Sequence, residues 1–234
     1  GKKSNGKKRG NTQMGRYKYG IYIPRNVAEA IAIDKREGNN LWRDAIISEV
    51  RSLMEMGTFR PISSAERANL GKDWQYAPML AVFDVKQDGR RKYRIVIGGH
   101  VLDASGYDTF ASNMKAISAR TLMLVADANE MEVLVGDISV AYLYAKNSMK
   151  VVVKLGQEFN LFDKSISVGQ PAVVEQAQYG QPTSANRWHA HLAGNLLSMN
   201  FRPSRYDKDV WFRYNPAYDL YDYIGTHTDD LMVV

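Results

Sequence analysis

Two runs of β-forming residues, AVFDVK (81–86) and KYRIVI (92–97), lie on either side of the tetrapeptide QDGR. An Asp-Gly pair between such runs predicts a β-hairpin, because glycine adopts the positive φ that a tight hairpin turn requires. Elsewhere, strand and helix patterns do not alternate regularly, which argues against a doubly wound parallel sheet. The order of the patterns therefore predicts an α+β fold.

Apolar periodicity predicts three helices. Apolar residues at helical spacing follow Asn40, which is expected to be the N-cap of the first helix. Ser118 is expected to cap a second helix that ends near Asn129. A third helix is expected after Thr183 or Ser184. Its apolar positions are Trp188, Leu192, Leu196 and Met199.

Alternation of side chains predicts three further strands. From Met131 to Ile138, Asp137 falls on the same face as the preceding odd-numbered apolar residues. The last residues of the chain predict two strands, 220–228 and 231–234, joined by an acidic turn at Asp229-Asp230.

The basic character of the chain belongs to residues 1–18. The formal net charge is +6, from 31 lysines and arginines against 25 aspartates and glutamates. Seven of those basic residues and no acidic residue lie in 1–18, which also lacks apolar periodicity. Such a composition predicts a disordered basic linker. It could solubilise the chain, contact nucleic acid weakly or serve as a nuclear-import patch, and it lacks the apolar region of a secretory signal.

Composition excludes several classes of protein and of site. Hydrophobic residues make up 45% of the chain and charged residues 24%, which is ordinary for a soluble globular domain. No apolar run approaches the roughly 18 residues that span a bilayer, so we expect no membrane partner. The chain has no cysteine, which excludes disulfides, thiolate metal ligands and a cysteine nucleophile. His189 and His191 are two residues apart in an expected helix, so they cannot jointly bind one metal.

Three carboxylates suggest a site for divalent cations. Asp137 ends an apolar strand, where burying an unpaired charge is costly, and Asp229 and Asp230 repel each other in a tight turn unless a cation lies between them. If the strand lies beside the C-terminal hairpin, Asp137 and Asp229 converge and can bridge two ions ~3.5–4 Å apart. Hard oxygen ligands suit Mg²⁺. The alternative is that Asp137 caps a helix beginning at Ser139 and that the two aspartates form an ordinary turn.

The predicted hairpin carries a cluster of basic residues, namely Arg90, Arg91, Lys92 and Arg94. On a two-stranded ribbon, such side chains can clamp a triphosphate or a nucleic-acid backbone. They can equally form a charged edge that prevents strand pairing. Tyr142, five residues after Asp137, is either a core aromatic or the floor of a sugar pocket beside the metal site.

Six stretches, in this order, resemble the reverse transcriptase domain of copia-type LTR retrotransposon polyproteins over about residues 19–234. They are YGIYIPRNVAEAIAIDKREGNNLWRDAI, VFDVKQDGRRKYRIVIGGH, VLVGDISVAYLYA, QYGQPTSANRWHAHL, NFRPSRYDKDVW and THTDDLMVV. The resemblance implies the fingers and palm of a right-hand polymerase with an antiparallel palm sheet, truncated before the thumb. After the linker 1–18, the fingers would be mainly 19–130 and the palm mainly 131–234.

The resemblance also implies roles for the acidic residues and their neighbours. Asp137 matches the first catalytic aspartate, which binds both metal ions, and the Ile138 carbonyl would add a ligand. Asp229 matches the second metal-binding aspartate, and Asp230 its catalytic neighbour, which coordinates less directly. Tyr142 matches the aromatic residue that excludes ribonucleotides by blocking the sugar 2′-OH.

Further residues match nucleotide-binding positions of the family. Arg94 matches the fingers arginine that packs on the incoming base and contacts its phosphates, and Lys92 and Arg90 are candidate triphosphate partners. Gly180 and Ser184 match the loop and helix that position the template and the incoming nucleotide.

The implied function is RNA-directed DNA polymerase. A primer 3′-OH attacks the α-phosphate of a deoxynucleoside triphosphate and pyrophosphate leaves, with catalysis by positioning and charge neutralisation. The implied cofactors are two Mg²⁺ ions, with Mn²⁺ as a substitute. The implied partners are an RNA or DNA template with primer, dNTPs, and either a second copy of the chain or integrase and RNase H regions of the same polyprotein. The implied location is intracellular, in a cytoplasmic particle, the nucleus or both.

The sequence departs from the family at two places. The usual Tyr-Val-Asp-Asp reads His-Thr-Asp-Asp at 227–230, and Gln178, Gln181 and Pro182 replace two leucines and a basic residue around Gly180. These departures favour one alternative, a degenerate and inactive element-derived protein. A second alternative is a nucleic-acid-binding module whose tail and basic hairpin contact phosphates. A nuclease that uses the same aspartates is a weaker third.

Overall fold

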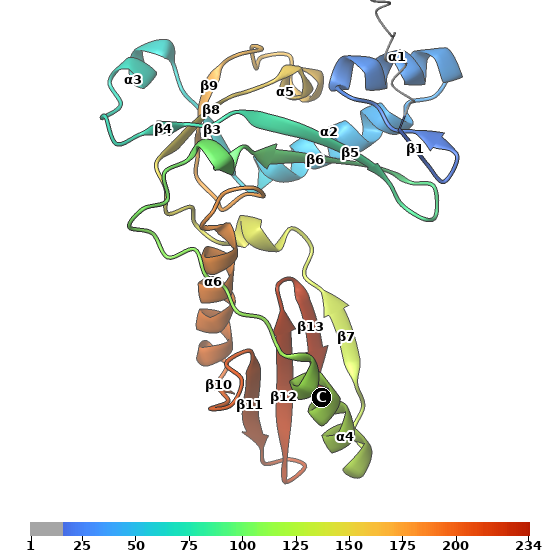
Figure 1. Cartoon of the computed structure of the whole chain (residues 1–234), viewed down its shortest axis with the longest axis vertical. Coiled ribbons are helices and arrows are strands. Elements are labelled where there is room, and N and C mark those ends of the chain that lie inside the picture. Colours follow the sequence, from blue (N-terminus) through green and yellow to red (C-terminus); the bar gives the residue numbers. More distant parts are fainter. Residues whose placement is uncertain (1–15) are drawn as a thin grey trace, which may run out of the picture. The chain divides into compact units, whose positions relative to one another are not determined.

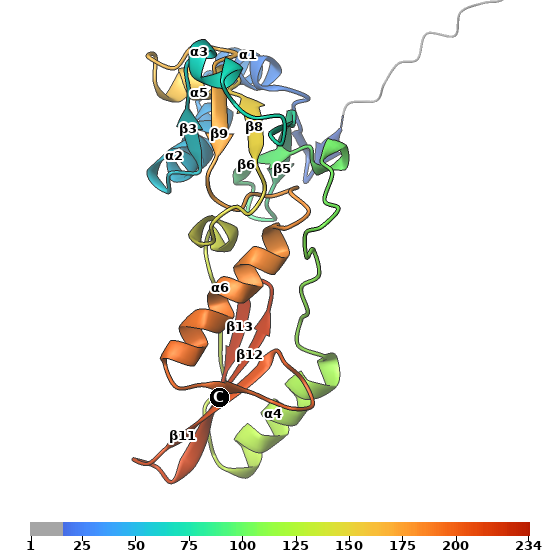
Figure 2. The ribbon, with the colours of Figure 1, turned by 90° about the vertical axis from the view of Figure 1, so that its left-hand side faces the viewer.

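The computed structural model describes residues 16–234, which form an α+β protein with several separate sheets (Figures 1 and 2). The chain divides into two compact units. One extends to Ile46 and includes Ala81–Arg94, and the other comprises Ile47–Leu80 and Ile95–Val234. The expected α+β class is confirmed, whereas the division into fingers and palm near residue 130 stays a prediction. Within residues 16–234, every helix is too short or too polar to cross a membrane.

In the first unit, a short hairpin precedes two helices. The elements are β1 (Tyr17–Lys18), β2 (Ile21–Tyr22), α1 (Val27–Glu37) and the start of α2 (Leu41–Glu55). Strands β1 and β2 pair antiparallel. Tyr17 and Lys18 belong to the segment expected to be disordered, but they form a strand, and the Lys18 ammonium makes a 2.6 Å ion pair with Asp84. Residues 1–15 lie outside the described residues, so for them the expected basic linker stays a prediction.

Helix α2 begins one residue after Asn40, as expected, but its capping carboxylate comes from α1. Asp34 accepts hydrogen bonds from the backbone N–H groups of Trp42 (3.1 Å) and Arg43 (2.8 Å). Asp34 is buried, and the N–H groups at the start of a helix stabilise its negative charge. Asn40 holds the predicted N-cap position, because its carbonyl accepts a 2.8 Å hydrogen bond from the Asp44 N–H. The side-chain acceptor is Asp34, which a local pattern cannot detect because it belongs to a neighbouring helix.

The predicted Asp-Gly hairpin is confirmed. Strands β5 (Met79–Val85) and β6 (Arg91–Ile97) are neighbours in a two-stranded sheet. The Lys86 N–H donates to the Arg90 carbonyl and the Gly89 N–H donates to the Lys86 carbonyl, each at 2.9 Å. Gly89 has a φ of 81°, which glycine adopts without the strain that a side chain would add.

The second unit contains a four-stranded sheet and a five-stranded sheet. The four-stranded sheet has the order β3-β9-β8-β4. Its strands are β3 (Phe59–Pro61), β9 (Pro171–Val174), β8 (Val151–Lys154) and β4 (Gln75–Tyr76). Its pairings are antiparallel except for the parallel pair β4–β8. The short helices of this unit are α3 (Ser64–Ala68), α5 (Gln157–Phe162) and the single turns η1 (Gly99–Val101) and η2 (Ala141–Tyr144).

The five-stranded sheet has the order β10-β11-β12-β13-β7 and is antiparallel throughout. Its strands are β10 (Arg202–Pro203), β11 (Val210–Asn215), β12 (Leu220–His227), β13 (Asp230–Val233) and β7 (Leu134–Asp137). The hydrogen-bonded register places β7 at one edge, directly beside β13.

Two helices cover the five-stranded sheet. Helix α6 (Ser184–Ser198) buries Trp188, Leu192 and Leu196 against Trp211 of β11. Helix α4 (Ala116–Ala128) buries Leu122 and Ala126 against Val210, the preceding residue of the same strand. Successive strand residues point to opposite faces, so the two helices lie on opposite faces of the sheet, as can be followed in Figure 2. The third predicted helix is thus confirmed with three of its four apolar positions buried, and Met199 is exposed beyond its end.

Helix α4 begins at Ala116, before the expected cap Ser118. The carboxylate of Asp207 accepts hydrogen bonds from the Lys115 N–H (2.9 Å) and the Ser118 hydroxyl (2.6 Å). Burial alone would raise the pKa of Asp207, but the hydrogen bonds from Ser118 and from backbone N–H groups outweigh it, so the pKa is lowered. The prediction of Ser118 as the cap is wrong, because the capping residue is 92 positions from Lys115 in the sequence.

Candidate functional site

The pairing of β7 with β13 brings three acidic residues together. Asp137 lies opposite Asp230 in the register, and the Ile138 N–H donates a 2.8 Å hydrogen bond to the Asp229 carbonyl. Opposite residues on adjacent antiparallel strands share a face, with Cβ atoms roughly 4.5–5.5 Å apart. The side chains of Asp137 and Asp230 therefore lie on one face of the sheet, next to the turn that carries Asp229.

Strand β7 is an edge strand and all four of its residues are exposed. The sequence argument from the cost of burying Asp137 is therefore wrong, because this carboxylate does not lie in an apolar interior. The alternative role as the cap of a helix at Ser139 is not seen either, since the next helical turn, η2, starts at Ala141 and follows Val140. Asp137 is instead an accessible carboxylate with a second carboxylate opposite it.

The turn between β12 and β13 has Thr228 and Asp229 as its central residues, because His227 pairs with Asp230. The expected turn at Asp229-Asp230 is thus shifted by one residue. Thr228 has a φ of 56°, and a positive φ at the first central position is the pattern of a type II′ turn, which favours glycine there. Val140, on the other side of the acidic residues, has a φ of 53°. Both are β-branched, so the backbone is strained on both sides of the acidic residues.

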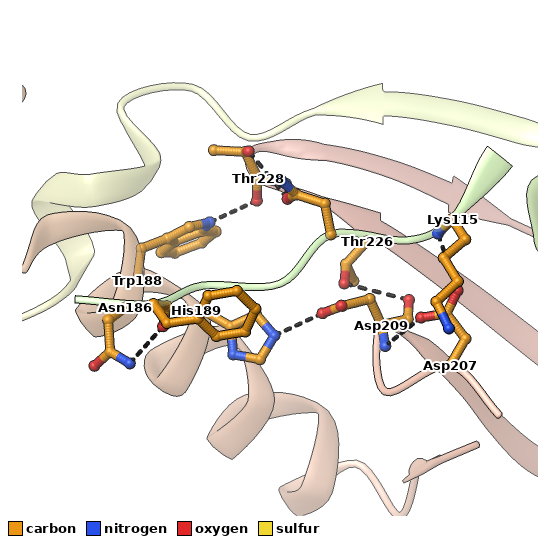
Figure 3. A network of polar contacts seen from close by, with 10 residues as sticks. Lys115, Asn186, Trp188, His189, Asp207, Asp209, Thr226 and Thr228 are labelled. Atoms are coloured by element: carbon orange, nitrogen blue, oxygen red, sulfur yellow. Dashed lines mark hydrogen bonds and ion pairs between the residues drawn. The ribbon is translucent and has the colours of Figure 1, made fainter. Parts of the chain in front are cut away.

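A network of polar contacts joins α6 to β12 through Asp209, the residue before β11, beside this turn (Figure 3). The Nε2 atom of His189 lies 2.6 Å from the Oδ1 atom of Asp209, whose side chain is 1% exposed. The Asp209 carbonyl accepts hydrogen bonds from the N–H (2.8 Å) and the hydroxyl (3.3 Å) of Thr226. A cavity of about 60 Å³ adjoins the network and is lined in part by Trp188 and Thr228. The network ties the strand that leads into the acidic turn to helix α6.

Tyr142 lies beside the acidic residues. It is half-buried in η2, and its ring packs edge-on against Tyr179 with the centroids 4.9 Å apart. Burial, and then the negative charge of Asp229, raise the pKa of Tyr142. The expected exclusion of ribonucleotides by this ring stays a prediction.

The loop before α6 is held by buried polar contacts. The Ser184 hydroxyl donates to the Gln178 carbonyl (2.7 Å) and accepts from the Gln178 N–H (3.0 Å), and the Gln178 amide donates to the Ile95 carbonyl (3.0 Å). Gly180 has a φ of 91°, and a Cβ there would lie 2.0 Å from the Ile97 carbonyl oxygen. Gly180 and Ser184 thus fix the shape of this loop, and their expected roles toward template and nucleotide stay predictions.

The predicted nucleotide-binding cations lie on the Asp-Gly hairpin. Arg90, Lys92 and Arg94 belong to the first unit, whereas the carboxylates belong to the second. Arg90 makes a 2.6 Å ion pair with Asp88 in the same turn. The pKa of Asp84 is lowered by Lys18, by a backbone N–H and, more weakly, by Arg94. The expected contacts of the three cations with a triphosphate stay predictions.

The donor set suits a cation that is shared with a ligand. Among residues 16–234, no three histidine, aspartate or glutamate side chains are grouped so that they could hold a metal ion by themselves. Mg²⁺ commonly uses one or two protein carboxylates and completes its shell with water and substrate phosphates. Asp137 and Asp230 on adjacent strands, with Asp229 in the adjoining turn, offer such oxygens at an exposed edge. The residues therefore fit Mg²⁺ or Mn²⁺ held jointly with a phosphate, rather than a closed protein cage.

Sequence reasoning missed the residues that support the acidic turn. Asn113 contacts Thr228 from the connection before α4, and His189 contacts Asp209 from α6. Neither contact has a local signal, because the partners are 115 and 20 residues apart. The acidic cluster Asp207-Lys208-Asp209 is visible in the sequence. In the structure, Asp207 caps α4 and Asp209 contacts His189 of α6. Comparison with known protein families and with curated proteins finds no match for this chain.

Proposed function

We propose that this chain is the fingers and palm part of an RNA-directed DNA polymerase, which transfers a deoxynucleotide from its triphosphate to a primer 3′-OH. The observation that carries the proposal is the antiparallel pairing that places Asp137 opposite Asp230 and next to Asp229. In the proposal, the five-stranded antiparallel sheet is the palm and the Asp-Gly hairpin belongs to the fingers. The resemblance to copia-type reverse transcriptases supports the same reading.

Each residue of the site has a stated task in this proposal. Asp137 and Asp229 would hold divalent cations, with the Ile138 carbonyl as a further ligand and Asp230 nearby. Bound cations would supply the charge neutralisation that phosphoryl transfer requires. Tyr142 would exclude the 2′-OH of a ribonucleotide, because its ring is packed against Tyr179 and cannot easily give way.

The remaining assigned residues would act on the incoming nucleotide. Arg94 would contact the base and its phosphates, and Lys92 and Arg90 would neutralise the triphosphate. Gly180 and Ser184 would fix the loop against which template and nucleotide are positioned. A protein nucleophile has no part in this mechanism, since the attacking group is the primer hydroxyl.

Primer extension by the purified chain tests the proposal. The assay uses an RNA template with a DNA primer, dNTPs and Mg²⁺, and compares Asp137→Asn with Asp219→Asn. Asp219 is exposed and lies between β11 and β12, so it controls for the chemical change elsewhere in the same sheet. We expect Asp137→Asn to abolish extension with unchanged circular dichroism, while Asp219→Asn extends as the wild type does. Equal extension by all three proteins would refute the catalytic assignment.

A nucleic-acid-binding protein without catalysis is a second candidate. The cluster of Arg90, Lys92 and Arg94 on the Asp-Gly hairpin favours it. In that case binding would come from phosphate contacts and would weaken steeply with salt. Salt-sensitive RNA or DNA binding that is indifferent to Mg²⁺ and dNTPs, without primer extension, would select this candidate over the polymerase.

A further inference from the structure

Three separate parts of the second unit form hydrogen bonds with the acidic turn. The Thr228 N–H and hydroxyl both donate to the Asn113 Oδ1 atom, at 2.8 and 3.2 Å. The Thr228 carbonyl accepts a 2.6 Å hydrogen bond from the Trp188 indole N–H, which Figure 3 shows. The Asp229 carbonyl accepts from the Ile138 N–H at 2.8 Å. The peptide groups on both sides of Thr228 and the carbonyl of Asp229 are therefore fixed.

The groups that contact Thr228 are themselves held firmly. Trp188 is 4% exposed and belongs to the apolar cluster between α6 and the sheet. The segment that carries Asn113 is bound to β12 by a 2.9 Å hydrogen bond from the Met114 N–H to the Thr226 carbonyl. It is bound to α6 by a 2.8 Å hydrogen bond from the Asn186 side chain to the Phe110 carbonyl. Asn113 and Trp188 thus contact the turn from two rigid supports.

We infer that Asn113 and Trp188 are positioning residues that hold Thr228 in its left-handed conformation and thereby place Asp229 beside Asp137. Left-handed backbone is unfavourable for a β-branched residue, so the turn needs an external restraint to keep this form. Any effect of this positioning on catalysis rests on the proposed function. The positioning itself is a property of the chain alone.

Amide hydrogen exchange of Ile138, measured by NMR on the purified chain without metal or nucleic acid, reports the position of the Asp229 carbonyl. Asn113→Ala removes two hydrogen bonds with Thr228, and Trp188→Phe removes one. We expect each variant to speed the exchange of Ile138 by at least about three- to tenfold, the effect of one lost hydrogen bond of ordinary strength. Ser198→Ala is the control, because it removes a side-chain hydrogen bond within α6 that involves neither Thr228 nor the segment that carries Asn113.

A rescue variant separates positioning from a general structural role. Thr228→Gly in the Asn113→Ala background should return Ile138 exchange to the wild-type rate, because glycine adopts a φ near 56° without strain. The inference is overturned if Asn113→Ala and Trp188→Phe leave the exchange of Ile138 unchanged. It is also overturned if Ser198→Ala speeds the exchange of Ile138 equally, or if Thr228→Gly fails to rescue.

Primer extension then distinguishes this inference from the proposed function. If both hold, Asn113→Ala lowers kcat with little change in the KM for dNTP, and Thr228→Gly restores kcat. If the wild-type chain shows no extension while the exchange results are as expected, the proposed function fails and the positioning of Asp229 stands. If Asn113→Ala extends at the wild-type rate although Ile138 exchanges faster, the catalytic part of the inference is refuted.

Discussion

Replacing Asp207 should destabilise the second unit, because its carboxylate is the cap of α4. It accepts hydrogen bonds from the Lys115 N–H (2.9 Å), the Ser118 hydroxyl (2.6 Å) and the Asp209 N–H (3.2 Å), and it is 6% exposed. A lost N-cap costs about 1 kcal/mol, and a hydrogen bond to a charged group is worth about 1.5–3 kcal/mol. Since these contributions overlap, we expect Asp207→Ala to lower the free energy of unfolding by about 2–3 kcal/mol at pH 7. The corresponding fall in Tm is about 4–12 °C for a chain of this size.

Urea unfolding followed by circular dichroism, repeated from pH 7 to pH 3, tests this prediction. The pKa of Asp207 is lowered in the folded protein, so its contribution is complete above the unfolded value near 3.9 and is lost as the pH falls through the folded value. The difference in free energy of unfolding between wild type and Asp207→Ala should therefore narrow below about pH 4. Asp127→Asn, at an exposed position of the same helix, should stay within about 0.5 kcal/mol of wild type. Equal stability of Asp207→Ala and wild type at pH 7, or a difference in free energy of unfolding that is as large at pH 3 as at pH 7, would refute the capping role.

Three further substitutions test other parts of the structure. Asp34→Ala should lower the free energy of unfolding by about 2 kcal/mol, because two N–H groups at the start of α2 lose a charged acceptor; unchanged urea unfolding would contradict this. Gly180→Ala should cost about 3 kcal/mol or more, because its Cβ would meet the Ile97 carbonyl at 2.0 Å in a left-handed backbone, and a wild-type Tm would show that the loop tolerates a side chain. Tyr142→Ala should allow ribonucleotide incorporation in primer extension, and unaltered sugar discrimination would remove Tyr142 from the proposed role.

The elements that the sequence predicts well are those with local causes. The hairpin at Gly89 follows from backbone chemistry within a few residues, and α6 follows from apolar spacing that buries Trp188. The side chains that cap α2 and α4 could not be found in this way, because Asp34 and Asp207 reach them from other elements. A predicted cap therefore indicates where a helix begins more reliably than it identifies the residue that stabilises that end of the helix.

The acidic site shows the same division between local and long-range causes. The sequence placed Asp137 at the end of a strand and Asp229 in a turn, and their convergence depended on a pairing that only the register of β7 and β13 supplies. The burial argument for Asp137 failed because β7 is an exposed edge strand. The contacts of Asn113 with Thr228 could not be predicted, since the connection before α4 has no apolar periodicity that would indicate its partners.

Single-nucleotide incorporation as a function of Mg²⁺ concentration tests the polymerase assignment most directly. A primer annealed to an RNA template is incubated with one labelled dNTP and either the wild-type chain or Asp137→Asn. We predict incorporation that saturates with Mg²⁺ for wild type, that Mn²⁺ also supports, and that is lost in Asp137→Asn. Incorporation that does not require a divalent cation, or that persists in Asp137→Asn, would contradict this prediction.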